Sequence, residues 1–401
     1  QSASGAQVLA LVQEDGLVAK SEEAVFQWMV RWQEAAQPTG AELLAAMKHV
    51  RFATMDAGFL DTTVRAWPAL ISVEGRDAIL DSFVVAGRAS RRSGFGAHLV
   101  YVLGGADTSE AYSSGLSTVD VYDPRTDAWK QVSSMATKRR QHRGVALDGK
   151  IYVMGGCTDG GSDALNTVDM YDPQSDQWQP LANMATGRRC FVAATVGNKI
   201  YAIGGQLNGG EEDSDGAYNV MLTETVEAFD LQLRAWAEVA TMSVGRCCHA
   251  AAVVDGKIYV IGGYDSDLQD VDSVEAYDPQ ADSWQQVASM PQPRRLHKAV
   301  AMGGKIYVSG GNLDDDDYFT RTVVVFDPQA NTWTELARMG TGRGDHASAA
   351  IGGKLYVFGG YSKDDGHGRI ASVEAYDPIS DTWAYVSDMT GDRDEFVAVA
   401  L

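Results

Sequence analysis

The sequence has 401 residues, of which 45% are hydrophobic and 22% are charged, and its formal net charge at pH 7 is −21. This length is sufficient for two domains and a large buried core. The acidic balance argues against nucleic acid as a partner, and no apolar run is long enough to cross a membrane. The four cysteines have no zinc or redox spacing, which indicates reduced thiols in the cytosol or nucleus.

Residues 1–92 are predicted to form a small α-helical domain. Glu22 and Glu23 follow Ser21, which is typical of a helix start with carboxylates in its first turn. Apolar residues then recur at helical spacing up to Trp32. Further helices are expected over residues 39–50, 57–67 and 75–85. The stretch Gly87–Gly96 is rich in Gly, Ser and Arg, and it is predicted to be a linker.

Six Gly-Gly doublets, each closing a short apolar run, organise the rest of the chain. Successive doublets lie 51, 49, 58, 48 and 49 residues apart, and each is followed by a Tyr-Asp or Phe-Asp pair and then a tryptophan. The doublets begin at Gly104, Gly155, Gly204, Gly262, Gly310 and Gly359, and the tryptophans are Trp129, Trp178, Trp236, Trp284, Trp333 and Trp383. This repeat is identified as the kelch type of β-propeller, with one four-stranded blade per repeat. We therefore predict an all-β six-bladed propeller over residues 98–401, preceded by the helical domain.

Each position of the repeat has an expected structural role. The doublet ends a buried strand where a Cβ atom would not fit, and the tryptophan fills the space between neighbouring blades. An arginine recurs four residues after a methionine in every repeat, which favours hydrogen bonds to carbonyls of the adjacent blade over ligand binding. Three residues later stand four histidines and two phenylalanines. Phenylalanine at this position argues for buried core histidines and against a metal site.

The two ends of the propeller are predicted to meet in one blade. The first repeat enters at its doublet strand, residues 98–103, without the strand that precedes it in the other repeats. The segment 393–401 matches that missing strand. We expect it to complete the first blade and to leave no exposed sheet edge.

The helical segment resembles the BACK domain, which lies between the BTB and kelch domains of Kelch-like proteins. The resemblance rests on Asp15–Phe26, Arg31-Trp32, Leu43-Leu44 and Val50–Phe52, and it continues through Phe59-Leu60 and Val64. The family carries a BTB domain before this region, whereas Gln1 enters partway through the BACK domain. We expect the chain to be a fragment of a longer protein, the alternative being a BACK-kelch protein without the dimerising module.

The loops that follow the doublets are acidic and should share one rim of the propeller. They include a long loop, Gln206–Thr225, and the run Asp314–Asp317 followed by Tyr318 and Phe319. Such a rim would attract a partner with basic segments, and Asp315, Asp316 and Tyr318 are predicted contact residues. The alternative is that the acidic loops only keep the protein in solution. Calcium binding by the Asp run is disfavoured because no recognised ligand spacing is present.

In Kelch-like proteins, the inner-rim positions between blades contact the substrate peptide. By that resemblance, Arg140, Arg189 and Arg295 would form a basic inner patch inside the acidic ring. Tyr264, Asn312 and Tyr361, each directly after a doublet, would add aromatic and amide contacts.

The resemblance implies a non-catalytic interaction module of the cytoplasm, with the nucleus or cytoskeleton as further locations. Its leading interpretation is the substrate receptor of a cullin-3 ubiquitin ligase adaptor, in which BTB and BACK regions engage the cullin and the propeller binds the substrate. The alternative is a cytoskeletal or structural scaffold. No phosphate loop, metal-binding string or nucleophile elbow is present, so no catalytic residue, metal or cofactor is predicted.

Overall fold

The computed structural model describes residues 99–107, 114–159, 163–208, 221–267, 269–313, 319–364 and 368–401. The chain divides into two units, Gln1–Gly96 and Ala97–Leu401. All described residues belong to the second unit, and their regular elements are β-strands. The helices expected within residues 1–92 therefore lie outside the described residues.

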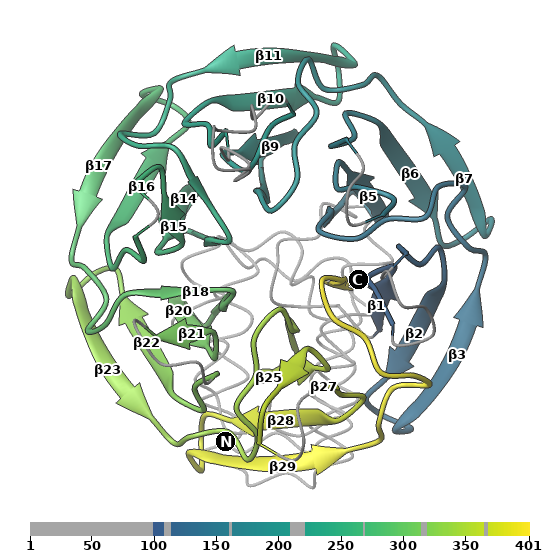
Figure 1. The fold of residues 1–401 in the computed structure, drawn as a ribbon, viewed down its shortest axis with the longest axis vertical. Helices are drawn as coiled ribbons and strands as arrows, with labels where there is room; N and C mark the ends of the chain where they lie inside the picture. Colours follow the sequence, from purple (N-terminus) through teal and green to yellow (C-terminus); the bar gives the residue numbers. More distant parts are fainter. Residues whose placement is uncertain are drawn as a thin grey trace, which may run out of the picture. The chain divides into compact units, whose positions relative to one another are not determined.

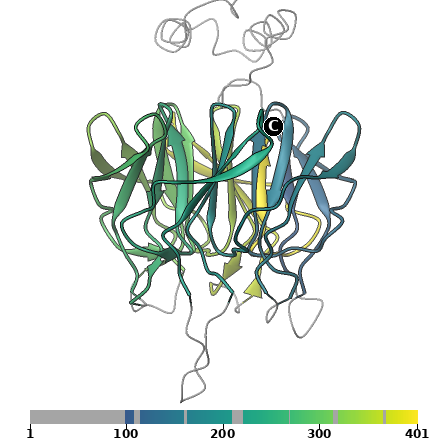
Figure 2. The ribbon, with the colours of Figure 1, turned by 90° about the horizontal axis from the view of Figure 1, so that it is seen from above.

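The described residues form six four-stranded antiparallel sheets around a central axis, which confirms the six-bladed propeller (Figures 1 and 2). Blade 1 consists of β1 (Val100–Leu103), β2 (Val119–Asp123), β3 (Ala128–Val132) and β30 (Val397–Ala400). Blade 2 consists of β4 (Arg143–Leu147), β5 (Lys150–Met154), β6 (Val168–Asp172) and β7 (Gln177–Pro180). Blade 3 consists of β8 (Val192–Val196), β9 (Lys199–Ile203), β10 (Val226–Asp230) and β11 (Ala235–Val239).

The remaining three blades repeat this order. Blade 4 consists of β13 (Ala250–Val254), β14 (Lys257–Ile261), β16 (Val274–Asp278) and β17 (Ser283–Val287). Blade 5 consists of β19 (Lys298–Met302), β20 (Lys305–Ser309), β22 (Val323–Asp327) and β23 (Thr332–Leu336). Blade 6 consists of β24 (Ala347–Ile351), β25 (Lys354–Phe358), β28 (Val373–Asp377) and β29 (Thr382–Val386). Three two-stranded sheets join the loops: β12 (Arg246–Cys247) with β15 (Tyr264–Asp265), β18 (Arg294–Arg295) with β21 (Asn312–Leu313), and β26 (Tyr361–Ser362) with β27 (Gly368–Arg369).

The core lies between the blades. The doublet strands are almost entirely buried, whereas the tryptophan strands lie at the periphery of the ring (Figure 1). One core cluster packs Tyr101 of blade 1 against Tyr171 and Trp178 of blade 2, and equivalent clusters fill the other interfaces. Each tryptophan also donates its indole N–H to a carbonyl oxygen of the neighbouring blade, at 2.8 to 3.2 Å. The predicted inter-blade role of the tryptophans is thus confirmed.

The glycine doublets are required by close backbone contacts. Gly155 has a φ of 62°, and a Cβ atom there would lie 2.6 Å from the carbonyl oxygen of Arg188. Gly105 has a φ of 95°, and its Cβ atom would lie 2.6 Å from the carbonyl oxygen of Asp394. Both the conformation and the space therefore exclude a side chain.

The recurring arginines are buried and tie each inter-blade loop to the sheet that follows it. Arg188 donates hydrogen bonds to the carbonyl oxygens of Gly204 and Thr225 at 2.9 and 3.2 Å, and its Nη2 atom lies 2.7 Å from a carboxylate oxygen of Glu227. Glu227 in turn accepts the backbone N–H of Ala185 at 2.7 Å. This confirms the structural role predicted for the arginines.

The four histidines of the repeat are also in the core, as predicted. His142, His249, His297 and His346 are at most 2% exposed. Burial, together with the positive charge of the nearby arginines, lowers the pKa of each well below its ordinary value. Their imidazoles are therefore neutral and serve the packing between blades.

The last strand of the chain completes the first blade. In the β1–β30 pair, Val100 lies opposite Ala400 and Leu103 lies opposite Val397. The backbone N–H of Leu401 also donates to the carbonyl oxygen of Leu99 at 3.0 Å. Blade 1 is therefore assembled from segments almost 300 residues apart in the sequence.

Removal of residues 394–401 should unfold or aggregate the propeller, because it exposes β1 and opens the ring. Circular dichroism and light scattering would measure both effects. Deletion of Leu401 alone, which keeps β30, serves as the control. A monomeric truncated chain with an unchanged unfolding midpoint would contradict this role of β30.

Replacement of Glu227 by valine should lower the free energy of unfolding by about 3–5 kcal/mol, because it leaves the buried Arg188 without its carboxylate. Urea denaturation would measure this loss. Glu238 lies opposite Glu227 on the neighbouring strand and is exposed. Glu238→Val should change the stability by no more than about 0.5 kcal/mol. Equal effects of the two substitutions would show that the buried ion pair is unimportant.

Candidate functional site

A closed ring of backbone hydrogen bonds surrounds the propeller axis. One residue from each inter-blade turn takes part, and each donates its N–H to the carbonyl oxygen of the preceding turn at 3.0 to 3.2 Å. The six residues are Gln141, Cys190, Cys248, Leu296, Asp345 and Glu395, and their φ angles lie between 49° and 59°. This left-handed conformation directs the six turns toward one another and fixes the relative positions of the blades.

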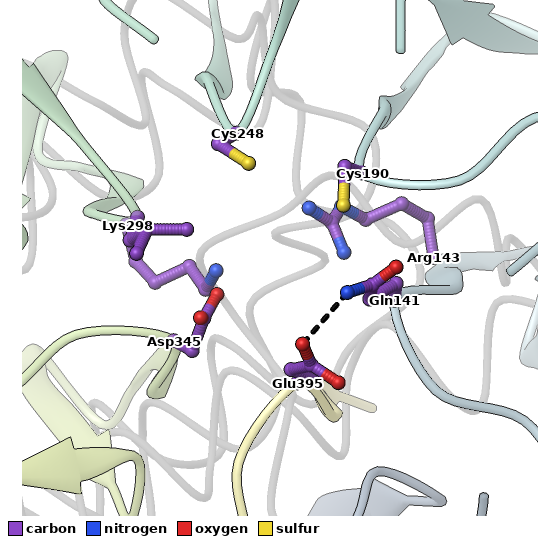
Figure 3. Close-up of a pocket in the computed structure, with 8 residues that line it drawn as sticks. Gln141, Arg143, Cys190, Cys248, Lys298, Asp345 and Glu395 are labelled. Atoms are coloured by element: carbon purple, nitrogen blue, oxygen red, sulfur yellow. Dashed lines mark hydrogen bonds between the residues drawn. The ribbon is translucent and has the colours of Figure 1, made fainter. Parts of the chain in front are cut away.

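The side chains of this ring converge on the axis with those of Arg143 and Lys298 (Figure 3). Gln141 donates a hydrogen bond from Nε2 to a carboxylate oxygen of Glu395 at 2.7 Å. The cavity between the eight side chains measures about 10 Å³, which is room for about one water molecule. Between these side chains there is thus no room for a larger ligand.

The charges around the axis compensate one another. Burial raises the pKa of Asp345 to about 7, with the negative charge of Glu395 adding to the shift. Burial also lowers the pKa of Lys298 to about 8, assisted by the positive charge of Arg143. The two groups point toward each other in Figure 3. Because both signs of charge are present, the axis is neither a strongly acidic nor a strongly basic site.

The three predicted inner-rim arginines differ in their surroundings. Arg140 forms an ion pair with Glu395, with 2.5 Å between Nε and the carboxylate oxygen. Arg189 lies in the next turn, and both arginines act electrostatically on the buried thiol of Cys157 between them. Arg295 lies two turns further round the ring. The structure therefore places a pair of arginines and a separate third one on the inner rim, and Glu395 compensates the charge of Arg140.

Arg295 is held by a carboxylate and an aromatic ring. Its Nη1 atom lies 2.7 Å from both carboxylate oxygens of Asp270, and its guanidinium lies 5.3 Å from the centre of the Tyr264 ring. The Asp270 side chain is 1% exposed, whereas that of Arg295 is 34% exposed. Asp270 therefore orients Arg295 and leaves part of its guanidinium available to a partner. No local pattern in the sequence indicates this pair, because its members are 25 residues apart.

A continuous series of partly exposed side chains extends from Tyr264 across blades 4, 5 and 6. Arg295 pairs with Asn312 in the two-stranded sheet β18–β21, and Asn312 forms a backbone bridge with Phe319. The Phe319 ring then contacts the Tyr361 ring edge to face at 6.0 Å. We call Tyr264, Arg295, Asn312, Phe319 and Tyr361 the rim patch. It contains four of the residues predicted from the sequence, together with Phe319.

Gly344 leaves the space that the Phe319 ring occupies in the rim patch. A Cβ atom at Gly344 would collide with the Phe319 ring. The other turns carry Arg, Cys or Asp at this position of the repeat, so glycine at this one position was the signal in the sequence. Tyr361 pairs with Gly344 through its backbone at 2.8 Å and thereby fixes the second ring beside the first.

Parts of the predicted acidic rim lie outside the described residues, including Asp315, Asp316, Tyr318 and residues 209–220. Asp265 and Asp267 follow Tyr264, and Asp267 is exposed. Asp364 forms an ion pair with Arg321 at 2.9 Å. Within the described residues, no group of three or more His, Cys, Asp or Glu residues could hold a metal ion. No helix in that part of the chain is long and apolar enough to cross a membrane.

Comparisons with known proteins agree with this architecture. The family model described as KLHDC2/KLHL20/DRC7 Kelch-repeats domain matches residues 190–395. The Kelch motif matches residues 87–136 and 138–185, and the model described as BTB And C-terminal Kelch matches residues 2–65. The predicted resemblance to BACK and kelch regions is thereby confirmed.

Individual relatives match parts of the chain. Kelch-like protein 3 of Homo sapiens and that of Bos taurus are each 31% identical over 165 residues, which cover 37% of this chain and 27% of the relative. F-box/kelch-repeat protein At1g22040 of Arabidopsis thaliana is 39% identical over 70 residues, or 16% of this chain and 15% of the relative. The matched regions thus span about a quarter or less of these curated relatives. Since the Kelch-repeats model alone matches just over half of the chain and a BACK region precedes it, the chain belongs to the kelch-repeat proteins and shares the BACK and kelch regions of the Kelch-like family.

Proposed function

We propose that the rim patch binds an extended segment of a partner protein that carries basic and apolar side chains. The observation that carries this proposal is the unbroken series of contacts from Tyr264 through Arg295, Asn312 and Phe319 to Tyr361. Partly exposed aromatic rings provide apolar contact area with little loss of conformational entropy. The partly exposed side chain of Arg295 adds a donor for a carboxylate or carbonyl oxygen of the same segment.

The backbone beneath the rim patch supports binding because it is already ordered. Four of the five residues lie in the two-stranded sheets β12–β15, β18–β21 and β26–β27. Arg295 is further held by the buried carboxylate of Asp270. A partner would therefore lose little affinity to the ordering of this surface.

The charge of the protein favours a basic partner segment. The net charge of −21 and the carboxylates of Asp265 and Asp267 beside Tyr264 would attract lysine and arginine side chains during encounter. Arg295 does not oppose this, because Asp270 compensates its charge. An apolar residue on the aromatic rings with basic residues beside it is the sequence type that these features would select.

At the level of the whole protein, we propose that this chain is the substrate-receptor part of a Kelch-like adaptor for a cullin-3 ubiquitin ligase. The BACK and Kelch-repeat matches and the similarity to Kelch-like protein 3 support this proposal. The propeller would select the substrate, and the BACK region would contribute to cullin binding. A scaffold would use the same rim without causing ubiquitination of the bound protein.

Replacement of Tyr264 and Tyr361 by alanine together should weaken partner binding by at least about tenfold, because buried aromatic anchors dominate such interfaces. Affinity purification with the full chain would first identify partners. Fluorescence polarisation with overlapping peptides of a recovered partner would then measure the dissociation constant. Ile379→Ala changes a residue that is 85% exposed in a blade 6 turn and serves as the control.

The results of these experiments would separate the alternatives. Loss of affinity with the double variant but not with the control supports the rim patch. Equal affinity of all three proteins would refute it. An Arg140, Arg189 and Arg295 triple alanine variant tests the inner rim separately. If the partner is ubiquitinated in a cullin-3-dependent manner, the ligase function holds, whereas stable co-assembly without ubiquitination favours a scaffold.

A further inference from the structure

One of the six recurring arginines has no carboxylate partner among the described residues. In five repeats, an Nη2 atom lies 2.6 or 2.7 Å from a carboxylate oxygen of the third strand of the blade. These pairs are Arg139–Asp169, Arg188–Glu227, Arg246–Glu275, Arg343–Glu374 and Arg393–Asp120. In blade 5, the equivalent position on β22 is Val324, whose side chain has no acceptor. Arg294 therefore lacks the ion pair that its five counterparts make.

The remaining contacts of Arg294 are few and long. It is 1% exposed, and it donates to the carbonyl oxygen of Gly310 at 3.2 Å and to Oγ1 of Thr322 at 3.4 Å. Its counterpart Arg343 makes the same two kinds of bond at 2.9 and 3.2 Å, another at 2.9 Å to the carbonyl oxygen of Ser372, and the carboxylate bond at 2.7 Å. Burial lowers the pKa of Arg294 to about 10, so the guanidinium remains charged at neutral pH.

The loop before Arg294 also differs from its counterpart before Arg343, at the residues whose N–H groups bond the carboxylate there. In blade 6, Glu374 also accepts the backbone N–H groups of Gly340 and Thr341, the two residues after the repeat methionine. In blade 5, the residues after the equivalent methionine are Pro291 and Gln292. Proline has no N–H to donate, so one donor is absent where the carboxylate is absent. The N–H of Gln292 and the guanidinium of Arg294 remain.

Among the residues that the structure describes, no carboxylate replaces the missing one. Glu335 lies opposite Val324 on β23 and raises the pKa of Arg294 through space. However, the Glu335 side chain is 56% exposed, and its carboxylate forms an ion pair with Arg338 at 3.1 Å. A buried guanidinium without a counter-charge is costly, and a mobile anion can supply that charge where the protein does not.

We propose that a small inorganic anion, of the charge and size of chloride, binds beside Arg294 between blades 4 and 5. It would occupy the place where the glutamates of blades 3, 4 and 6 present an oxygen atom. In blade 6, the N–H of Thr341 and Nη2 of Arg343 both bond Oε1 of Glu374. By analogy, the N–H of Gln292, Nη2 of Arg294 and the hydroxyl group of Thr322 would be the donors to the anion. Thr322 accepts a hydrogen bond from Thr320 at 3.0 Å, which leaves its own hydroxyl hydrogen to donate to the anion.

The site would couple anion binding to the stability of the propeller. The donors come together only in the folded chain, so an anion that binds them stabilises the folded state. At a concentration ten times the dissociation constant, the folding equilibrium constant would increase about elevenfold. Urea denaturation of the full chain at constant ionic strength, with chloride progressively replacing gluconate, would measure this increase.

Val324→Glu is the decisive variant, because its carboxylate would take the place of the anion. This variant should be more stable than the wild type in gluconate and should lose the chloride response. Thr334→Glu adds the same charge at an exposed position of β23 and should keep the response. A bromide-soaked crystal of the wild type should show an anomalous peak beside Arg294.

Two results would overturn the proposal. One is that chloride stabilises the wild type no more than it stabilises the Val324→Glu variant. The other is a bromide-soaked crystal with ordered water, and no anomalous peak, beside Arg294. If Val324→Glu fails to fold, the crystal decides alone, because it needs no variant.

Discussion

The buried arginine at each blade junction is the interaction on which the propeller depends. At each junction its guanidinium joins the loop that enters a blade to the carbonyl at the glycine doublet, to a carboxylate on the third strand, or to both, and the carboxylate is present at five of the six junctions. A charged group in the core is tolerated only when its donors are used in this way. The glycine doublets follow from the same arrangement, because the backbone must approach the arginine loop too closely for a Cβ atom.

The repeat made most of the fold predictable. Tryptophan and arginine recur once in each structural unit, and a histidine or phenylalanine follows each arginine, so the periodicity of the sequence indicates their shared environments. The closure of the ring was predictable for a related reason, since one repeat lacked a strand and the other end supplied it. Within residues 1–92, the BACK model matches residues 2–65, while the helices predicted there fall outside the described residues.

Features that break the repeat were harder to infer. The Asp270–Arg295 pair joins a variable loop to the inner rim, and no periodic signal marks a pairing across 25 residues. The rim patch depends on Gly344, whose role follows from the ring that lies over it. The resemblance to Kelch-like proteins suggested a basic inner patch, and in the structure Arg140 and Arg295 each have a carboxylate partner. The features that distinguish this propeller thus lie where its six-fold repeat is broken, both at the rim and at Arg294.

The ring of backbone hydrogen bonds around the axis has a direction. Each of the six residues, from Gln141 to Glu395, donates its N–H to the carbonyl oxygen of the preceding turn. All six bonds therefore run in the same direction around the axis. Bonds in such a cycle polarise one another, while their dipoles, arranged head to tail in a closed loop, sum to nearly zero. The backbone ring therefore contributes rigidity and a net dipole close to zero. Charged side chains contribute the larger part of the potential at this face, and single substitutions can change it.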